Sequence, residues 1–217
     1  MWRCSTIFLL GLALWIEPAS AQEIKAHPLT VSIHTVLSSS LARNDIEDIL
    51  NKASDLLQHN DGCSCKVGFK LSGAVTTFTS APADITNVNE LEEAHEVPAD
   101  VKVVQSITFC APGEGRYFGC AWRPGGRQRT VIISLEGISV GLGPVALAHE
   151  YGHTTGLLHR NQEDNLNLMT PCGIQAFNKQ INQNECAHFR AGPVLRYPPG
   201  LGPKCPDDTV SVQDRTD

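Results

Sequence analysis

The segment at residues 149–159, HEYGHTTGLLH, places the strongest constraint on how this chain can fold. His149 and His153 are four residues apart, so on a helix they lie on one face and are close enough to bind one metal ion. On a continuous helix, His159 would be rotated by roughly 240° and raised by roughly 9 Å, away from the other two. Gly156 can adopt a positive φ without steric cost, so the chain can leave the helix there. We therefore expect the helix to end near Gly156 and a turn to bring His159 back to the other two histidines.

These residue types favour a zinc site with catalytic chemistry. Three histidines leave the fourth position of a tetrahedral zinc ion open, as in catalytic rather than structural sites. Glu150 directly follows the first histidine and can reach a zinc-bound water without binding the metal, which suits a general base. A zinc finger with two Cys and two His is the other metal site considered. It fits poorly because the chain has no CXXC pair, and Cys63 and Cys65 are too close together. The remaining histidines lack metal-ligand spacing and are interpreted as ordinary: His27, His34, His59, His95 and His188.

The N-terminal residues 1–21 have the pattern of a secretory signal peptide. One positive charge, Arg3, precedes an uncharged apolar run at residues 6–16, and Ala19-Ser20-Ala21 matches a cleavage signature of small residues. The run has about 11 residues, too few to span a membrane, which takes about 20. A buried N-terminal helix is the alternative. We expect cleavage after Ala21 and a mature protein that is secreted to an extracellular or periplasmic compartment.

The charge and the cysteines limit the partners and the compartment of the protein. The chain has 17 Lys and Arg against 23 Asp and Glu, a net charge of −6, which argues against nucleic acid and anionic membranes as partners. One of the eight cysteines, Cys4, would leave with the signal peptide. The remaining number is odd, so at least one thiol is free or bonded to another molecule, while export permits the others to pair. The residues alone leave the disulfide connectivity open.

Hydrophobic patterning predicts a strand, a helix, several strands and then the helix that carries the histidines. A backing helix is expected after a capping box that starts at Asn44, and a C-terminal helix after a second one that starts at Asn182. The polar, acidic stretch at 81–100 is expected to be an exposed loop. Residues 191–217 are rich in Pro and Gly and are expected to form a tail. Strands are expected at 29–37, 65–69, 75–78, 101–109, 117–122 and 129–135.

The segment HEYGHTTGLLH resembles the extended zinc motif of the metzincin metallopeptidases. Met169 lies ten residues after His159 and resembles the methionine of the family's Met-turn, which supports the zinc site from beneath without binding the metal. Leu168 before it and Pro171 after it are most similar to the matrixin version. Arg160, directly after the third histidine, differs from the residue usual in matrixins, reprolysins or astacins, so the subfamily stays open.

The resemblance implies an α+β fold with a twisted, mostly parallel sheet and one antiparallel edge strand. A helix would back this sheet, and the active-site helix would lead into a small C-terminal subdomain with the Met-turn and a C-terminal helix. The metallopeptidase domain would span residues 22–190, with an upper part at 22–156 and a lower part at 157–190.

The resemblance also implies where a substrate would bind. The edge strand, with Gly119, Cys120 and Ala121, would pair with an extended peptide by strand addition. Pro171 would border the specificity pocket. Two disulfides are expected in this arrangement: Cys172–Cys186 across the wall of the pocket, and Cys110–Cys120 between neighbouring strands.

The function implied is that of a secreted zinc endopeptidase with one catalytic Zn²⁺ and an extended peptide or protein as substrate. Glu150 would take a proton from the zinc-bound water and return it to the leaving amine. The alternative is a secreted, disulfide-stapled binding module with a structural zinc. A third hypothesis is a latent protease in which residues 22–27, with Glu23 as the candidate group, or a free thiol covers the zinc. Calcium sites and oligomeric state are undetermined by the sequence.

Overall fold

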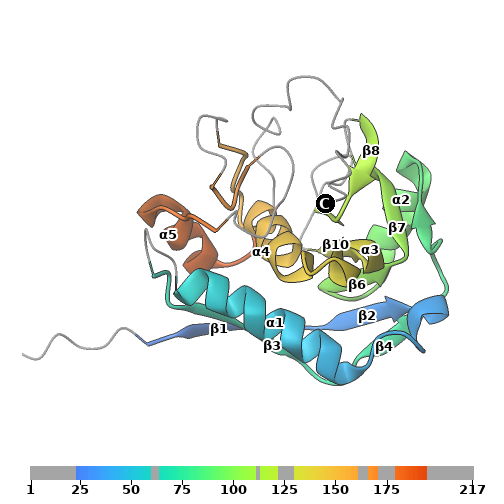
Figure 1. The fold of residues 1–217 in the computed structure, drawn as a ribbon, viewed down its shortest axis with the longest axis horizontal. Helices are drawn as coiled ribbons and strands as arrows, with labels where there is room; N and C mark the ends of the chain where they lie inside the picture. Colours follow the sequence, from blue (N-terminus) through green and yellow to red (C-terminus); the bar gives the residue numbers. More distant parts are fainter. Residues whose placement is uncertain are drawn as a thin grey trace, which may run out of the picture.

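Strands and helices are interspersed along the chain in a mixed α/β fold with mostly parallel strands (Figure 1). The computed structural model describes residues 23–59, 64–110, 113–121, 130–160, 166–170 and 179–194. The predicted signal peptide and almost all of the predicted tail lie outside these residues. Among the residues described, no helix is long and apolar enough to cross a membrane.

The largest sheet has five strands in the order β4-β2-β6-β10-β9. Four of them are parallel, and the fifth, β9, pairs antiparallel with β10 at one edge. The mostly parallel sheet with one antiparallel edge strand is therefore confirmed. Val and Ile fill the central strands, as expected for a sheet covered on both faces. The strands are β2 (Val31–His34), β4 (Thr76–Phe78), β6 (Val101–Val104), β9 (Gly119–Cys120) and β10 (Val131–Ser134).

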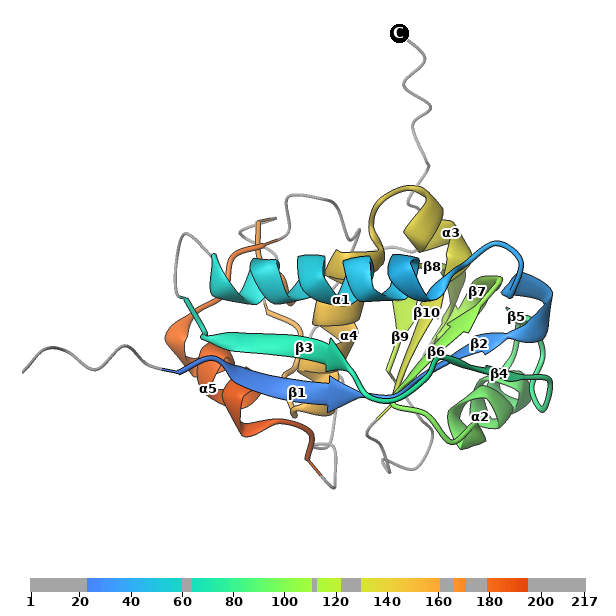
Figure 2. The same cartoon turned by 90° about the horizontal axis from the view of Figure 1, so that it is seen from below.

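The first predicted strand is in fact two strands followed by a 3-10 helix at Thr35–Leu37. β1 (Lys25–Leu29) pairs in parallel with β3 (Val67–Leu71), and only then does the chain enter β2. The break falls at Thr30, because its backbone N–H donates to the Asp100 carboxylate at 2.7 Å instead of to a neighbouring strand. Along the chain, β1 is followed by β2, and β3 is followed by β4. The same two stretches of chain therefore pair twice, first as β1 with β3 and then as β2 with β4 (Figure 2).

Helix α1 (Arg43–Gln58) lies along β3 and backs the sheet, as predicted (Figure 2). It begins before the predicted cap at Asn44, since the Asp45 carboxylate accepts a hydrogen bond from the backbone N–H of Ala42 at 2.7 Å. Its apolar face is buried in the main core, which the sheet and α4 also line. The buried apolar residues of α1 are Ile46, Ile49, Leu50, Ala53 and Leu57.

The predicted exposed loop at 81–100 is wrong, because it contains the short strand β5 (Asp84–Ile85) and the helix α2 (Val88–Glu96). The Asn87 side chain caps this helix by accepting two backbone N–H groups of its first turn. Leu91 is fully buried in a second core. Acidic side chains surround the short apolar face of α2, so its helical periodicity is not evident in the sequence.

A second sheet has the order β5-β7-β8. In it β7 (Ser106–Cys110) runs antiparallel to β8 (Gly113–Tyr117). The predicted strand at 101–109 is therefore divided between two sheets. The division falls at Gln105, whose backbone N–H donates to the carbonyl of Ala83 at 2.7 Å.

Three helices complete the described fold: α3 (Leu135–Ser139), α4 (Gly143–Thr154) and α5 (Gln183–Ala191). The capping box predicted for α5 is confirmed. The Asn182 side chain accepts the backbone N–H of Glu185 at 2.9 Å, and the Glu185 carboxylate accepts that of Asn182 at 2.8 Å.

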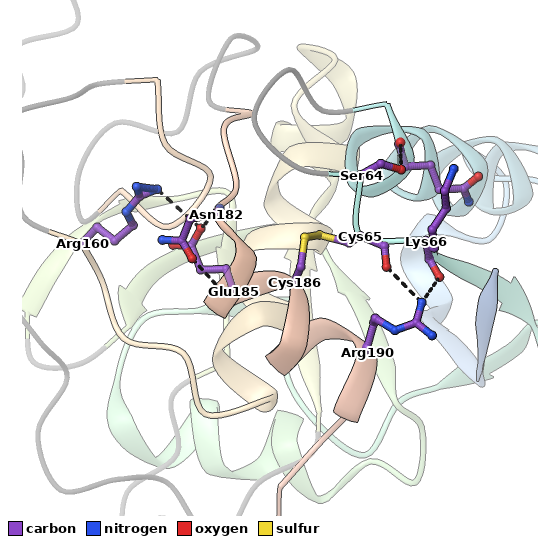
Figure 3. The surroundings of a disulfide bond; sticks show 9 residues. Ser64, Cys65, Lys66, Arg160, Asn182, Glu185, Cys186 and Arg190 are labelled. Carbon is purple, nitrogen blue, oxygen red and sulfur yellow. Dashed lines mark hydrogen bonds and ion pairs between the residues drawn. A yellow bond between two sulfur atoms is a disulfide. The ribbon is translucent and has the colours of Figure 1, made fainter. Parts of the chain in front are cut away.

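Two disulfides are present among the described residues, and one of them corrects a prediction. Cys110–Cys120 joins β7 to β9 as expected. Cys186 bonds to Cys65, with a Cα–Cα distance of 4.7 Å, so the predicted Cys172–Cys186 pair is wrong (Figure 3). Tertiary packing explains this pairing, because α5 lies beside the segment that leads into β3. Cys65 in that segment precedes Cys186 by 121 residues. Cys172 itself lies outside the described residues.

Candidate metal centre

Three histidines meet at the C-terminal end of α4. His149 and His153 are buried on this helix, and His159 is half-buried beyond its end. The Nε2 atom of His153 lies 3.1 Å from Nε2 of His149 and 3.1 Å from Nε2 of His159. One nitrogen from each residue lies within 4.8 Å of the others, so together they can hold one metal ion.

The turn that brings His159 back is located at Gly156, which has φ +89°. The backbone N–H of Gly156 donates to the carbonyl of His153 at 2.9 Å, and that of Leu157 donates to the carbonyl of Gly152 at 3.1 Å. This pair of hydrogen bonds is a Schellman motif, which ends a helix with one residue in the left-handed region. The sequence prediction of a helix end at Gly156 is therefore confirmed.

Backbone carbonyls orient the two helical histidines. Nδ1 of His149 lies 2.7 Å from the carbonyl oxygen of Leu168, and Nδ1 of His153 lies 2.8 Å from that of Leu157. A carbonyl only accepts hydrogen bonds, so each Nδ1 carries the hydrogen. In a neutral ring this leaves the Nε2 lone pair directed at the other histidines.

The donor set fits a metal cation. Burial lowers the pKa of His149 to about 3, and burial together with the neighbouring histidines lowers that of His153 well below its usual value. Both rings are then neutral, and two Nε2 lone pairs face each other at 3.1 Å, where neither can donate a hydrogen bond. A cation between them satisfies both. Zinc ligands at 2.0–2.1 Å in tetrahedral geometry are about 3.3 Å apart, which is close to the distance observed.

Glu150 lies on the same helix, and its side chain is directed against the edge strand β9. A Cβ atom on Gly119 would come within 2.6 Å of the Glu150 Cγ, so the strand and the side chain are in close contact. Glu150 is only 6% exposed, and burial raises its pKa to about 8, against the effect of a hydrogen bond with the backbone of Ala121. A cation held by the histidines would lower that pKa and favour the carboxylate.

Met169 is packed directly against α4, and its side chain is 1% exposed. A Cβ atom on Gly152 would lie 2.6 Å from the Met169 Sδ, so the glycine between the two helical histidines makes room for the methionine. Sequence analysis missed this role of Gly152. The signal was present, because a glycine in the interior of a helix calls for a packing reason.

The predicted substrate-binding residues are partly described. Gly119, Cys120 and Ala121 are all buried, Cys120 and Ala121 completely so. In the described part of the chain, β10 is the one strand that pairs with β9. Pro171 lies outside the described residues.

Residues 25–27 of the N-terminal segment do not cover the histidines. Residues Lys25 to His27 belong to β1, and the His27 ring packs against Tyr151. Tyr151 is two residues from each helical histidine and is therefore on the opposite side of α4. The hypothesis that this segment makes the protein latent is wrong for these residues.

The sequence matches no protein-family model, and no curated protein matches it. Among solved structures, the chain is similar to a metalloproteinase-II from Bacteroides fragilis, with 12% identity and a TM-score of 0.43. That similarity covers 80% of this chain and 55% of the other, so the chain spans about half the length of that structure.

Proposed function

We propose that this chain is a secreted zinc-dependent endopeptidase of the metzincin type. The observation that carries the proposal is the convergence of three histidine Nε2 atoms, two of them fixed as lone-pair donors by carbonyl contacts on Nδ1. The motif HEYGHTTGLLH, with Met169 packed under the helix, supports the metzincin type. The similar metalloproteinase structure is too distant to add to this argument.

In this proposal His149, His153 and His159 hold one Zn²⁺ and leave a coordination position open. A zinc ion in such a site supplies Lewis acidity, which acidifies a bound water and polarises the scissile carbonyl. The protein's own contribution is to keep the rings of His149 and His153 neutral and oriented, since burial and the carbonyl contacts do both.

Glu150 is the proposed general base. Its carboxylate would take the proton from the attacking water and deliver it to the leaving amine. The backbone contact with Ala121 and the close approach of Gly119 hold this side chain beside the edge strand. The carboxylate and the strand that would pair with the substrate are thus positioned together.

The substrate proposed is an extended peptide or protein that adds to the edge of the five-stranded sheet at Gly119, Cys120 and Ala121. Pro171 would border the specificity pocket, and Met169 would support the site without binding metal. The signal peptide at 1–21, the metallopeptidase domain at 22–190 and the tail at 191–217 belong to the same proposal. Two disulfides are consistent with an extracellular or periplasmic protein.

The test compares the mature chain with a Glu150→Gln variant. Zinc content is measured on both, and cleavage is measured on a proteome-derived peptide library with and without a chelator. We expect one zinc per chain in both proteins, cleavage by the wild type that the chelator abolishes, and a loss of about 10²-fold or more in the variant. Undiminished cleavage by the variant would contradict the role of Glu150. A zinc-loaded wild type without activity on any peptide would instead support a binding module.

A further inference from the structure

The position of His159 depends on the chain that follows it. His149 and His153 are fixed by α4 itself, whereas His159 lies three residues beyond the glycine that ends the helix. A ligand on such a segment needs other contacts to hold it within reach of the same metal. The next residue, Arg160, makes contacts of this kind, although sequence analysis noted it only as a departure from the metzincin pattern.

Arg160 is bound to two separate parts of the molecule. Its backbone N–H donates to the carbonyl of Met169 at 2.9 Å, and its Nη1 donates to the side-chain oxygen of Asn167 at 2.6 Å. The same Nη1 lies 3.4 Å from Oε2 of Glu185 on α5. Arg160 thus connects the residue after the third histidine to the segment at 166–170 and to the start of α5.

The contact with Glu185 differs from an ordinary surface ion pair. Glu185 is 3% exposed, and its Oε2 also accepts the backbone N–H of Asn182 at 2.8 Å. Its other oxygen, Oε1, is buried without a hydrogen-bond partner in the described part of the chain. The Glu185 carboxylate is buried and only partly hydrogen-bonded, so its charge needs the nearby Arg160 cation for stabilisation. Removing one partner of a buried ion pair is strongly destabilising.

Helix α5 is itself firmly attached to the segment that leads into β3. Cys186, directly after Glu185, forms the disulfide with Cys65, and Arg190 donates to the carbonyls of Cys65 and Lys66 at 3.3 and 3.1 Å (Figure 3). Figure 3 shows Arg160 and Arg190 on opposite sides of this disulfide. Glu185 therefore offers Arg160 a fixed partner.

We propose that Arg160 is a positioning residue that holds His159 in the metal site, and that Glu185 of α5 and Asn167 keep Arg160 in place. This inference rests on the proposed function, since it takes His159 as a metal ligand. Contacts behind a ligand typically change metal affinity by about 10- to 100-fold when they are removed.

The experiment replaces Arg160 by Met and uses Arg190→Met as the matched control. Both changes remove an arginine that links α5 to another part of the molecule, but only Arg160 adjoins a ligand. The dissociation constants of Zn²⁺ and Co²⁺ are measured on the mature chain by competition with a chromophoric chelator, together with the Co²⁺ absorption spectrum and thermal unfolding without metal.

Arg160→Met is expected to weaken metal binding by about 10- to 100-fold and to change the Co²⁺ spectrum. Arg190→Met is expected to lower the unfolding temperature but to leave the metal affinity within about twofold, since the disulfide keeps α5 in place. Should Arg160→Met fail to fold, Arg160→Lys keeps the charge but not the planar fork, and binding weakened by several-fold is expected.

Equal metal affinity in the wild type and the Arg160 variant, or equal losses in the Arg160 and Arg190 variants, would overturn the positioning role while leaving the metal site intact. A wild type that binds no metal would overturn the proposed function, and this proposal with it. The two failures are therefore distinguishable.

Discussion

At the scale of single residues, the candidate site depends on positions where a side chain is absent. Gly152 leaves space for the Met169 sulfur between the two helical histidines, and Gly119 leaves space for Glu150 against β9. In both cases an added Cβ atom would lie 2.6 Å from the neighbouring side chain. That is too short for a non-bonded contact, so the side chain or the backbone would have to shift. The geometry of the site therefore extends beyond the three histidines and the glutamate.

A Gly119→Ala substitution should separate the base from the metal. The three atoms nearest to the added methyl group all belong to Glu150, so we expect kcat/KM for peptide cleavage to fall by about tenfold or more with unchanged zinc affinity. Gly68→Ala in β3 is the control, because its nearest neighbour is the end of the flexible Gln58 side chain. Unchanged kcat/KM in Gly119→Ala would show that Glu150 has room to move without loss of function.

At the scale of elements, the two disulfides attach parts of the fold at very different separations. Cys110–Cys120 closes a loop between residues ten apart, and Cys65–Cys186 closes one between residues 121 apart. The second bond ties α5 to the start of β3, while the first joins β7 to the strand that contacts Glu150. The chain entropy that each bond removes from the unfolded state grows with loop length.

Removing Cys65–Cys186 should therefore destabilise the protein more than removing Cys110–Cys120. The loop-entropy relation predicts losses of about 5 and about 3 kcal/mol for the two Cys-to-Ala double variants, a difference of about 2 kcal/mol. The free energy of unfolding is measured by denaturant titration of each variant and the wild type. Equal losses, or a larger loss for Cys110–Cys120, would show that native-state packing rather than loop length sets these contributions.

At the scale of the whole molecule, one ionisable side chain of the main sheet is enclosed by the protein and reaches toward α2. Lys102 on β6 is fully buried, and its Nζ donates to the backbone carbonyl of His95 on α2 at 3.3 Å. Burial lowers the pKa of Lys102 from 10.5 to about 7, and the charge of Asp100 opposes this only in part. The folded state thus binds this proton more weakly than the unfolded state does.

This difference predicts how stability depends on pH. Between pH 7 and 10.5 the unfolded chain binds more protons, so the free energy of unfolding should rise with pH in that window, and the full destabilisation should be present below about pH 7. Lys102→Met should remove this rise and stabilise the protein by a few kcal/mol near pH 6, since each pKa unit corresponds to about 1.4 kcal/mol. Denaturant unfolding of both proteins from pH 6 to 10 is the measurement. Parallel stability curves would contradict the prediction.

The described fold follows the sequence where a signal is local and strong. The central strands of the main sheet are rich in Val and Ile, and the capping box at Asn182 and Glu185 starts α5 as predicted. The prediction failed at 81–100, where the apolar face of α2 is short and surrounded by acidic residues. It also failed at Thr30 and Gln105, because hydrogen bonds to residues from elsewhere in the chain break the strands there.

Helical spacing and the sterics of positive φ act within a few residues, so the relation between His149, His153 and Gly156 can be predicted from the motif alone. Packing between distant segments brings Cys186 to Cys65, Glu150 against β9 and Arg160 to α5. These contacts join residues between 25 and 121 positions apart. They depend on how helices and sheet pack, which no local pattern of residues records.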